Sequence, residues 1–435
     1  MIGLDQAGDR SSGRVAGRPS SLATLHAAIS TPLHRGALYI FGGAVAGNVL
    51  GAVAMLVAAR LYPAADVGSG VALMAAAGFL STVASLALGT GLIRYLPIAA
   101  DRSRLVRFSV ALTAAMSLGA GVVYLAGRGI WARGLPILDS PIFQVAFVLA
   151  IGASAAMMLQ DGLLIAMRRS GLIAARSVES GVLRILALAG MTALGAFGIF
   201  GSWLVALAAP VAHVAARRPS AGIGSASKSL AAVPAGEVVR YSAGNYFIDL
   251  VVSLPQTAMP LLIVALLGAA PSAYFSVGML AALVGYTVSR ASAASLQAES
   301  ARCPESTLPN MTRALRFTLI QTIPLTVAAW VLAEPMLGLF GSAYAAEGAW
   351  PLRVLVASSL PLTVGSAYSA VCRARARLAE LFMVSLAAAV LSLVVAIALI
   401  EPLGLVGPAL GMLVWHSTVA AIGGVRLLAW NRAAS

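Results

Sequence analysis

The sequence predicts an all-α polytopic membrane protein, with twelve transmembrane helices in two six-helix lobes around a central cavity. Three observations lead to this fold class. The composition is 60% hydrophobic and only 10% charged, whereas a soluble domain carries about 25% charged residues. Apolar runs recur along the chain, most of them longer than the roughly 20 residues that cross the hydrocarbon core of a bilayer. One long polar linker divides these runs into two sets of six.

The chain begins with a polar segment, residues 1–36, which carries several Arg, Gly and Ser residues. No apolar segment of signal-peptide type follows its basic residues directly, so it predicts a disordered cytoplasmic tail. The apolar runs come next, and only Gly198 and its neighbours separate the fifth from the sixth. The twelve predicted spans are 37–60, 68–92, 108–127, 141–167, 178–197, 199–216, 241–267, 271–296, 314–333, 351–371, 379–400 and 403–428.

The polar linker is residues 217–240, RRPSAGIGSASKSLAAVPAGEVVR, which is rich in Gly, Ser, Pro and Ala. It predicts a cytoplasmic connection between an N-terminal six-helix lobe, 37–216, and a C-terminal six-helix lobe, 241–428. Residues 429–435 then form a cytoplasmic C-terminal tail. Two such lobes with a cavity between them are the layout of many transporters.

The basic residues predict the orientation in the membrane. With the N-terminus inside, 25 of the 29 basic residues fall on the cytoplasmic side, and only Arg60, Arg128, Arg133 and Arg353 fall outside. Such an excess is the positive-inside pattern of multi-pass proteins. We therefore expect a multi-pass protein of the inner or plasma membrane with both termini in the cytoplasm. The same pattern explains the net charge of +14, so no nucleic-acid partner is expected.

Catalytic and metal-binding motifs are absent from the sequence. It contains no Gly-rich phosphate loop, no metal-ligand spacing and no Ser/His/Asp arrangement. Cys303 and Cys372 both fall in predicted cytoplasmic loops, so no disulfide framework is expected. We expect no enzymatic activity, catalytic residue, metal or cofactor. Any work must then draw on an ion gradient, the membrane potential or a substrate gradient.

The seventh predicted span carries a polar stripe. Asn245, Asp249, Val252 and Gln256 have the spacing i, i+4, i+7 and i+11, which places them on one face of a helix. Asp249 lies about 8 residues from the start of the span, roughly 12 Å deep. A polar stripe cannot face lipid without a large cost in free energy. We expect it to face a cavity or another helix.

Four charged residues are predicted to lie within spans, in the inner half of the membrane: Asp161, Arg184, Asp249 and Arg290. An intramembrane charge suggests a functional site. The alternative is an ion pair between helices that only stabilises packing, such as Asp249 with Arg290. Both interpretations remain open at this point.

Four segments resemble a known family in their order and spacing. They are AARLYPAADVGSGVALMAAAGFLSTVASLALGTGLIRYLP at 58–97, LLGAAPSAYFSVGMLAALV at 266–284, LGLFGSAYAAEGAWPLRVLVASSLP at 337–361 and EPLGLVGPALGMLV at 401–414. The chain resembles the polysaccharide flippases, of the O-antigen and exopolysaccharide type, of the multidrug/oligosaccharidyl-lipid/polysaccharide exporter superfamily. The resemblance extends over about 37 to 428.

This resemblance implies a flippase that moves a polyprenyl-pyrophosphate-linked saccharide from the inner to the outer leaflet by alternating access, for cell-surface polysaccharide biosynthesis. Implied partners are this substrate, membrane lipids, and the glycosyltransferases and polymerase of the same pathway. Arginine is the natural partner of a pyrophosphate. The candidate substrate-binding residues are Arg290, Arg184, Asn245, Gln256 and Asn48, and the candidates for ion or proton coupling are Asp249 and Asp161.

Two other functions remain open. The first is a cation-coupled multidrug antiporter, although related antiporters often carry an acid in the first helix and this first span has only Asn48. The second is a non-transporting scaffold of envelope assembly, which has no need for Asp249 at depth. Related lipid II flippases have fourteen spans, against the twelve predicted here. A cavity lined by acids and aromatics would favour drug efflux, and a basic cavity with a lipid-sized side opening would favour the flippase.

Overall fold

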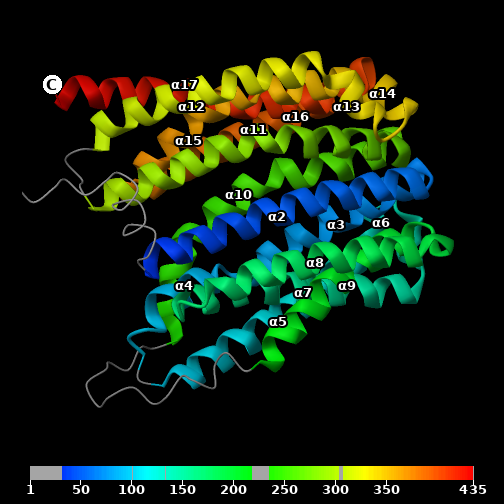
Figure 1. The fold of residues 1–435 in the computed structure, drawn as a ribbon, viewed down its shortest axis with the longest axis horizontal. Helices are drawn as coiled ribbons and strands as arrows, with labels where there is room; N and C mark the ends of the chain where they lie inside the picture. Colours follow the sequence, from blue (N-terminus) through cyan, green and yellow to red (C-terminus); the bar gives the residue numbers. More distant parts are fainter. Residues whose placement is uncertain (1–31, 100, 133, 218–234, 303–306, 435) are drawn as a thin grey trace, which may run out of the picture.

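The computed structural model describes residues 32–99, 101–132, 134–217, 235–302 and 307–434, which form helices and no strand. The long helices run side by side along the long axis of the molecule (Figure 1). The predicted all-α membrane fold is therefore confirmed. Most of the predicted N-terminal tail, up to residue 31, and the linker segment 218–234 lie outside the described residues.

The helices are, in chain order, α2 (Pro32–Leu61), α3 (Ala64–Ser85), α4 (Leu88–Tyr95), α5 (Arg102–Ala126), α6 (Arg128–Trp131), η1 (Pro136–Asp139), α7 (Pro141–Ala166), α8 (Ser170–Gly190), η2 (Thr192–Leu194), α9 (Ala196–Ala216), α10 (Ala235–Leu267), α11 (Ala269–Arg302), α12 (Thr307–Val331), α13 (Ala333–Gly338), α14 (Ser342–Ala357), α15 (Ser359–Ala374), α16 (Leu378–Leu403) and α17 (Val406–Ala434).

Among the described residues, eleven helical segments are long and apolar enough to cross a membrane, with α14 and α15 counted as one. The remaining long helix, α8, has 21 residues and carries Arg176, Glu179 and Arg184. It packs closely against α2 and α9 within the bundle. About twelve membrane helices therefore fit the structure. The charges of α8 explain why it is less apolar than the others.

Several predicted span boundaries were wrong. The fifth span was expected at 178–197, but α8 begins at Ser170 and ends at Gly190, because its charged first half resembles a loop in sequence. The chain then turns through Gly195, whose φ of 52° is in the left-handed region that suits glycine. The second span was expected as one helix at 68–92. It is broken between α3 and α4 at Leu86 and Ala87, which have φ values of 46° and 49°.

Helices α2 to α9 form a first half of the molecule and α10 to α17 a second half, and α3 is the main contact between them. It packs against both α10 and α11, whereas α2 packs mainly against α8 of its own half. At Gly68 of α3 an added Cβ would lie 1.7 Å from the carbonyl oxygen of Ala269. Only glycine allows the two backbones to come this close.

Figure 1 shows that α2 begins and α17 ends at the same end of the bundle. We call it the basic end. Its described arginines lie on the connections at this end and on the adjoining helix ends: Arg94, Arg102, Arg104, Arg107, Arg168, Arg169, Arg217, Arg313, Arg316, Arg373, Arg375, Arg377, Arg426 and Arg432. The opposite end has Arg60, Arg128 and Arg353 among the described residues. Arg60 Nε there donates a hydrogen bond to the carbonyl oxygen of Leu339, at 2.8 Å, which also joins the two halves.

Candidate functional site

A large cavity with polar side chains lies between the two halves. This inter-half cavity has a volume of about 900 Å³ and is lined by α2, α11 and α12. Its polar side chains are Asn48 of α2, Thr287, Ser292 and Ser295 of α11, and Asn310, Arg313 and Gln321 of α12. No Asp or Glu belongs to the described lining. The cavity therefore carries a single positive charge.

Apolar side chains complete the inter-half cavity. Val45 and Val49 of α2, Val284 of α11 and Phe317 of α12 all line it and are exposed. Exposed apolar side chains on membrane-spanning helices are suited to contact with lipid tails. The cavity thus joins a polar wall to an apolar one. An amphipathic molecule would satisfy both.

A second cavity lies within the second half, between α10, α11, α15, α16 and α17. This second-half cavity has a volume of about 250 Å³. Arg290 and Gln297 of α11, Arg373 of α15 and His416 of α17 are its titratable or amide-bearing lining residues. The predicted site residue Arg290 therefore lies here and not in the inter-half cavity.

The polar stripe of α10 faces the interior of the second half. Val252 lines the second-half cavity, and Asp249 forms an ion pair with Arg373 of α15, with 3.2 Å between Oδ1 and Nη2. Asp249 is thus paired with Arg373 and not with Arg290. The expectation that the stripe faces a cavity or another helix is confirmed for these two positions.

The two amides of the same stripe are placed less fully. Gln256 is half-buried, and its Nε2 has no hydrogen-bond partner among the described residues. Asn245 lies on α10, but its side chain is outside the described part of the chain. Asn48 is the one predicted substrate-binding residue found on the inter-half cavity.

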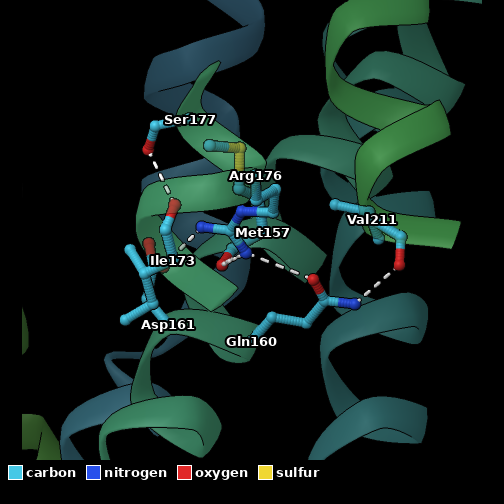
Figure 2. A network of polar contacts seen from close by, with 7 residues as sticks. All are labelled: Met157, Gln160, Asp161, Ile173, Arg176, Ser177 and Val211. Carbon is cyan, nitrogen blue, oxygen red and sulfur yellow. Dashed lines mark hydrogen bonds and ion pairs between the residues drawn. The ribbon is translucent and has the colours of Figure 1, made fainter. Parts of the chain in front are cut away.

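Asp161 belongs to a network that joins α7, α8 and α9 (Figure 2). It pairs with Arg176, whose side chain is only 1% exposed. Arg176 Nη1 also donates to Gln160 Oε1 at 3.2 Å and to the carbonyl oxygen of Met157 at 3.3 Å. Gln160 Nε2 donates to the carbonyl oxygen of Val211, at 2.8 Å. Three acceptors of α7 thus surround Nη1 and Nη2 of the buried guanidinium, while its Nε has no partner among the described residues.

Arg184, the other predicted arginine, is half-buried on α8. Its Nη2 lies 3.4 Å from Met74 Sδ on α3, and its Nε is buried without a partner among the described residues. No carboxylate pairs with it in the part of the chain that the structure describes. The structure does not bring Arg184 and Arg290 to one cavity.

Arg313 and Gln321 of the inter-half cavity were not predicted as site residues from the sequence. The ninth span was expected to begin at 314, so Arg313 was treated as a loop residue, whereas α12 begins at Thr307. Positions 310, 313, 317 and 321 follow helical spacing and form one face. That spacing was the signal that could have revealed them.

Solved structures of membrane transporters match this fold. An inward-facing multidrug resistance MATE family transporter of the MOP superfamily matches with a TM-score of 0.67 and 14% identity, over 89% of this chain and 96% of that one. The lipid II flippase MurJ, in an inward closed conformation, matches with a TM-score of 0.72 and 12% identity, over 90% and 87%.

The chain shares its fold with these transporters. A mutant of the Vibrio cholerae MATE transporter VcmN has the same fold, with a TM-score of 0.60 and 15% identity, over 94% of this chain and 98% of that one. No family model and no curated protein matches the sequence. These identities show a shared fold, so function has to be argued from this chain's own residues.

Proposed function

We propose that the protein is a flippase that moves a polyprenyl-pyrophosphate-linked saccharide across the membrane by alternating access of its two halves. The inter-half cavity carries this proposal. Its polar wall offers a guanidinium, from Arg313, and amides, from Asn48 and Gln321. Its apolar wall consists of exposed side chains on membrane-spanning helices. A lipid-linked saccharide has matching polar and apolar parts.

In this proposal the headgroup enters from the basic end, which is cytoplasmic. Arg313 lies seven positions into α12 counted from Thr307, so a pyrophosphate reaches it near the membrane surface. A guanidinium binds phosphate oxygens through two parallel hydrogen bonds. The prenyl chain stays in the gap between α2 and α12, beside Val49 and Phe317. The saccharide fills the remaining polar volume.

The two halves then change from a conformation open to the cytoplasm to one open to the opposite side of the membrane. They are held together at the end opposite the basic end by the Gly68–Ala269 contact and the Arg60–Leu339 hydrogen bond. Release of the headgroup on the far side requires that these contacts open and that the gap between α2 and α12 closes. Asp249 and Asp161 are the proposed coupling acids, because each carboxyl group pairs with an arginine of a neighbouring helix. Arg184 is proposed to attract the headgroup through its uncompensated charge.

A cation-coupled multidrug antiporter is the second candidate, since two of the matching folds belong to MATE transporters. A cationic drug would be stabilised by carboxylates in the cavity. The described lining of the inter-half cavity has none and contains Arg313 instead. Its charge favours an anionic headgroup over a cationic drug.

The direct test compares two arginines of α12. Arg313 lines the inter-half cavity and Arg316, one turn further, does not belong to its lining; both are exposed. Export of surface polysaccharide is measured in a strain that depends on this protein, at equal membrane levels of each variant. Arg313→Gln is expected to lower export by about tenfold or more, because a hydrogen bond to a charged group contributes about 1.5–3 kcal/mol. Arg316→Gln should leave it near wild type. Equal losses in the two variants would contradict the proposal.

A further inference from the structure

The second-half cavity contains an arginine without a carboxylate partner. Arg290 lines the cavity, and no ion pair or hydrogen bond holds its guanidinium among the described residues. The other cavity arginine, Arg373, is already neutralised by Asp249. No Asp or Glu contributes to the described lining. The cavity therefore has a net positive charge within the membrane-spanning region.

A buried histidine lines the same cavity. His416 is 3% exposed, and its Nε2 has no hydrogen-bond partner among the described residues. Its ring is stacked on Trp415, with 5.0 Å between ring centroids, and is T-shaped to Tyr286, at 5.1 Å. The ring is thus held in place while one of its nitrogens stays unused. A buried polar atom without a partner costs about 1–3 kcal/mol, and a ligand would remove this cost.

The partners of the other ring nitrogen indicate that Nε2 is an acceptor. His416 Nδ1 lies 3.1 Å from Ser358 Oγ, which lies 2.6 Å from Tyr286 Oη and 2.7 Å from the carbonyl oxygen of Leu355. When Tyr286 donates to Ser358 and Ser358 donates to Leu355, Ser358 has no hydrogen left for the ring. The neutral imidazole then carries its single hydrogen on Nδ1, which donates to Ser358, and Nε2 is left as an acceptor. A hydroxyl group of a ligand, such as the P–OH of hydrogen phosphate or a glycerol hydroxyl of a phosphatidylglycerol headgroup, can donate to Nε2 while the phosphate oxygens accept from Arg290.

We propose that the second-half cavity is a binding site for a small phosphate-type oxyanion, held by the guanidinium of Arg290 and by His416, with Gln297 and Ser366 as further polar neighbours. Arg373 lines the same cavity and would interact with the bound oxyanion while it is paired with Asp249. A volume of about 250 Å³ suits a small anion and is below the roughly 300–1,000 Å³ of sites for drug-sized ligands. The oxyanion comes either from solution at the basic end or from the headgroup of a membrane phospholipid.

This site is separate from the inter-half cavity. Arg290 lines the second-half cavity, while Arg313 lines the inter-half cavity. Binding of an oxyanion in the second-half cavity does not depend on which substrate is transported. The oxyanion site and the transport function can therefore be tested independently.

The experiment measures thermal unfolding of the purified full-length protein in nanodiscs of phosphatidylcholine, as inorganic phosphate is titrated at constant ionic strength against gluconate. Wild type is expected to show a saturable rise of the unfolding midpoint, because a ligand that binds only the folded state stabilises it. Arg290→Gln should weaken the apparent affinity for phosphate by about tenfold or more. Arg290→Lys should weaken the phosphate affinity less, because lysine keeps the positive charge and loses only the planar, two-pronged donor geometry of the guanidinium.

Arg316→Gln is the matched control, since it removes one exposed arginine outside the cavity. His416→Gln, which keeps a hydrogen-bond acceptor, should retain more affinity than His416→Leu. Replacing part of the phosphatidylcholine by phosphatidylglycerol identifies the source: competition with phosphate in wild type and not in Arg290→Gln indicates a lipid headgroup, and no competition indicates the free ion. A non-saturable midpoint shift, or equal phosphate affinity in wild type and Arg290→Gln, would overturn the proposal.

Discussion

Asp249 of α10 and Arg373 of α15 form an ion pair, with 3.2 Å between Oδ1 and Nη2. The pair joins two helices of the second half at the wall of its cavity. Both side chains are partly exposed, 48% for Asp249 and 25% for Arg373. Such pairs contribute little to stability, about 0–1 kcal/mol. Stabilisation of helix packing alone is therefore a weak explanation for an aspartate at position 249.

The first prediction follows from that pair. Asp249→Asn should unfold within a few degrees of wild type, because it removes at most about 1 kcal/mol. Export should nevertheless fall, or lose its dependence on pH or sodium, if Asp249 is a coupling acid. Unchanged export with an unchanged response to pH and sodium would leave Asp249 a packing residue. Replacing Asp249 and Arg290 together should show no coupling in a double-mutant cycle, since the two are not paired.

The second prediction concerns the pair of Arg176 with Asp161. Arg176 is 1% exposed and Asp161 is 39% exposed. Asp161→Ala leaves a buried guanidinium without its carboxylate, which costs about 3–5 kcal/mol. Arg176→Met leaves a carboxylate that can still reach solvent, so its cost should be smaller. Thermal unfolding of both variants in detergent shows which of the two is less stable. A less stable Arg176→Met would contradict the structural role of this network.

The third prediction tests the contact between the halves. An added Cβ at Gly68 would meet the carbonyl oxygen of Ala269 at 1.7 Å, whereas one at Gly78 on the same helix has no neighbouring atom within 4 Å. Gly68→Ala should therefore force α3 and α11 apart and lower the unfolding midpoint, at a cost of about 1–3 kcal/mol. Gly78→Ala is the control and should be neutral or slightly stabilising. Equal midpoints for the two variants would mean that the helices separate here without cost.

The fourth prediction concerns orientation. The gathering of arginines at one end of the bundle predicts that this end is cytoplasmic. A reporter fused after Arg377, at the basic end, should be cytoplasmic, and one fused after Gly341, at the opposite end, should be external. The reversed result would invert the direction of transport that we propose.

The sequence predicted the architecture because the bilayer leaves few choices. Apolar length and arginine position together indicated about twelve helices and the end at which the arginines gather. The helix α8 was placed eight residues too late, because Arg176 and Glu179 are typical of a loop until their partners on α7 and α9 are known. Local pattern could not supply those partners.

The candidate site was predicted less well. Asn48 was expected and lines the inter-half cavity, while Arg290 lies in a different cavity from the one anticipated. Depth along a helix identifies a costly charge, but the direction in which it faces depends on the packing of other helices. His416 gave no sequence signal at all, since a lone histidine acquires its role from neighbours such as Ser358 and Trp415.

The most direct test of the proposed function is translocation by the purified protein in liposomes. A fluorescent polyprenyl-pyrophosphate disaccharide is placed in both leaflets, and a membrane-impermeant quencher is added outside. Active flippase should make nearly all of the fluorescence accessible to the quencher, and Arg313→Gln should slow this by about tenfold, while empty liposomes stop near half. If quenching stops near half with the wild-type protein, and the same liposomes instead accumulate a cationic dye in response to a proton or sodium gradient, the protein is an antiporter and the flippase account is wrong.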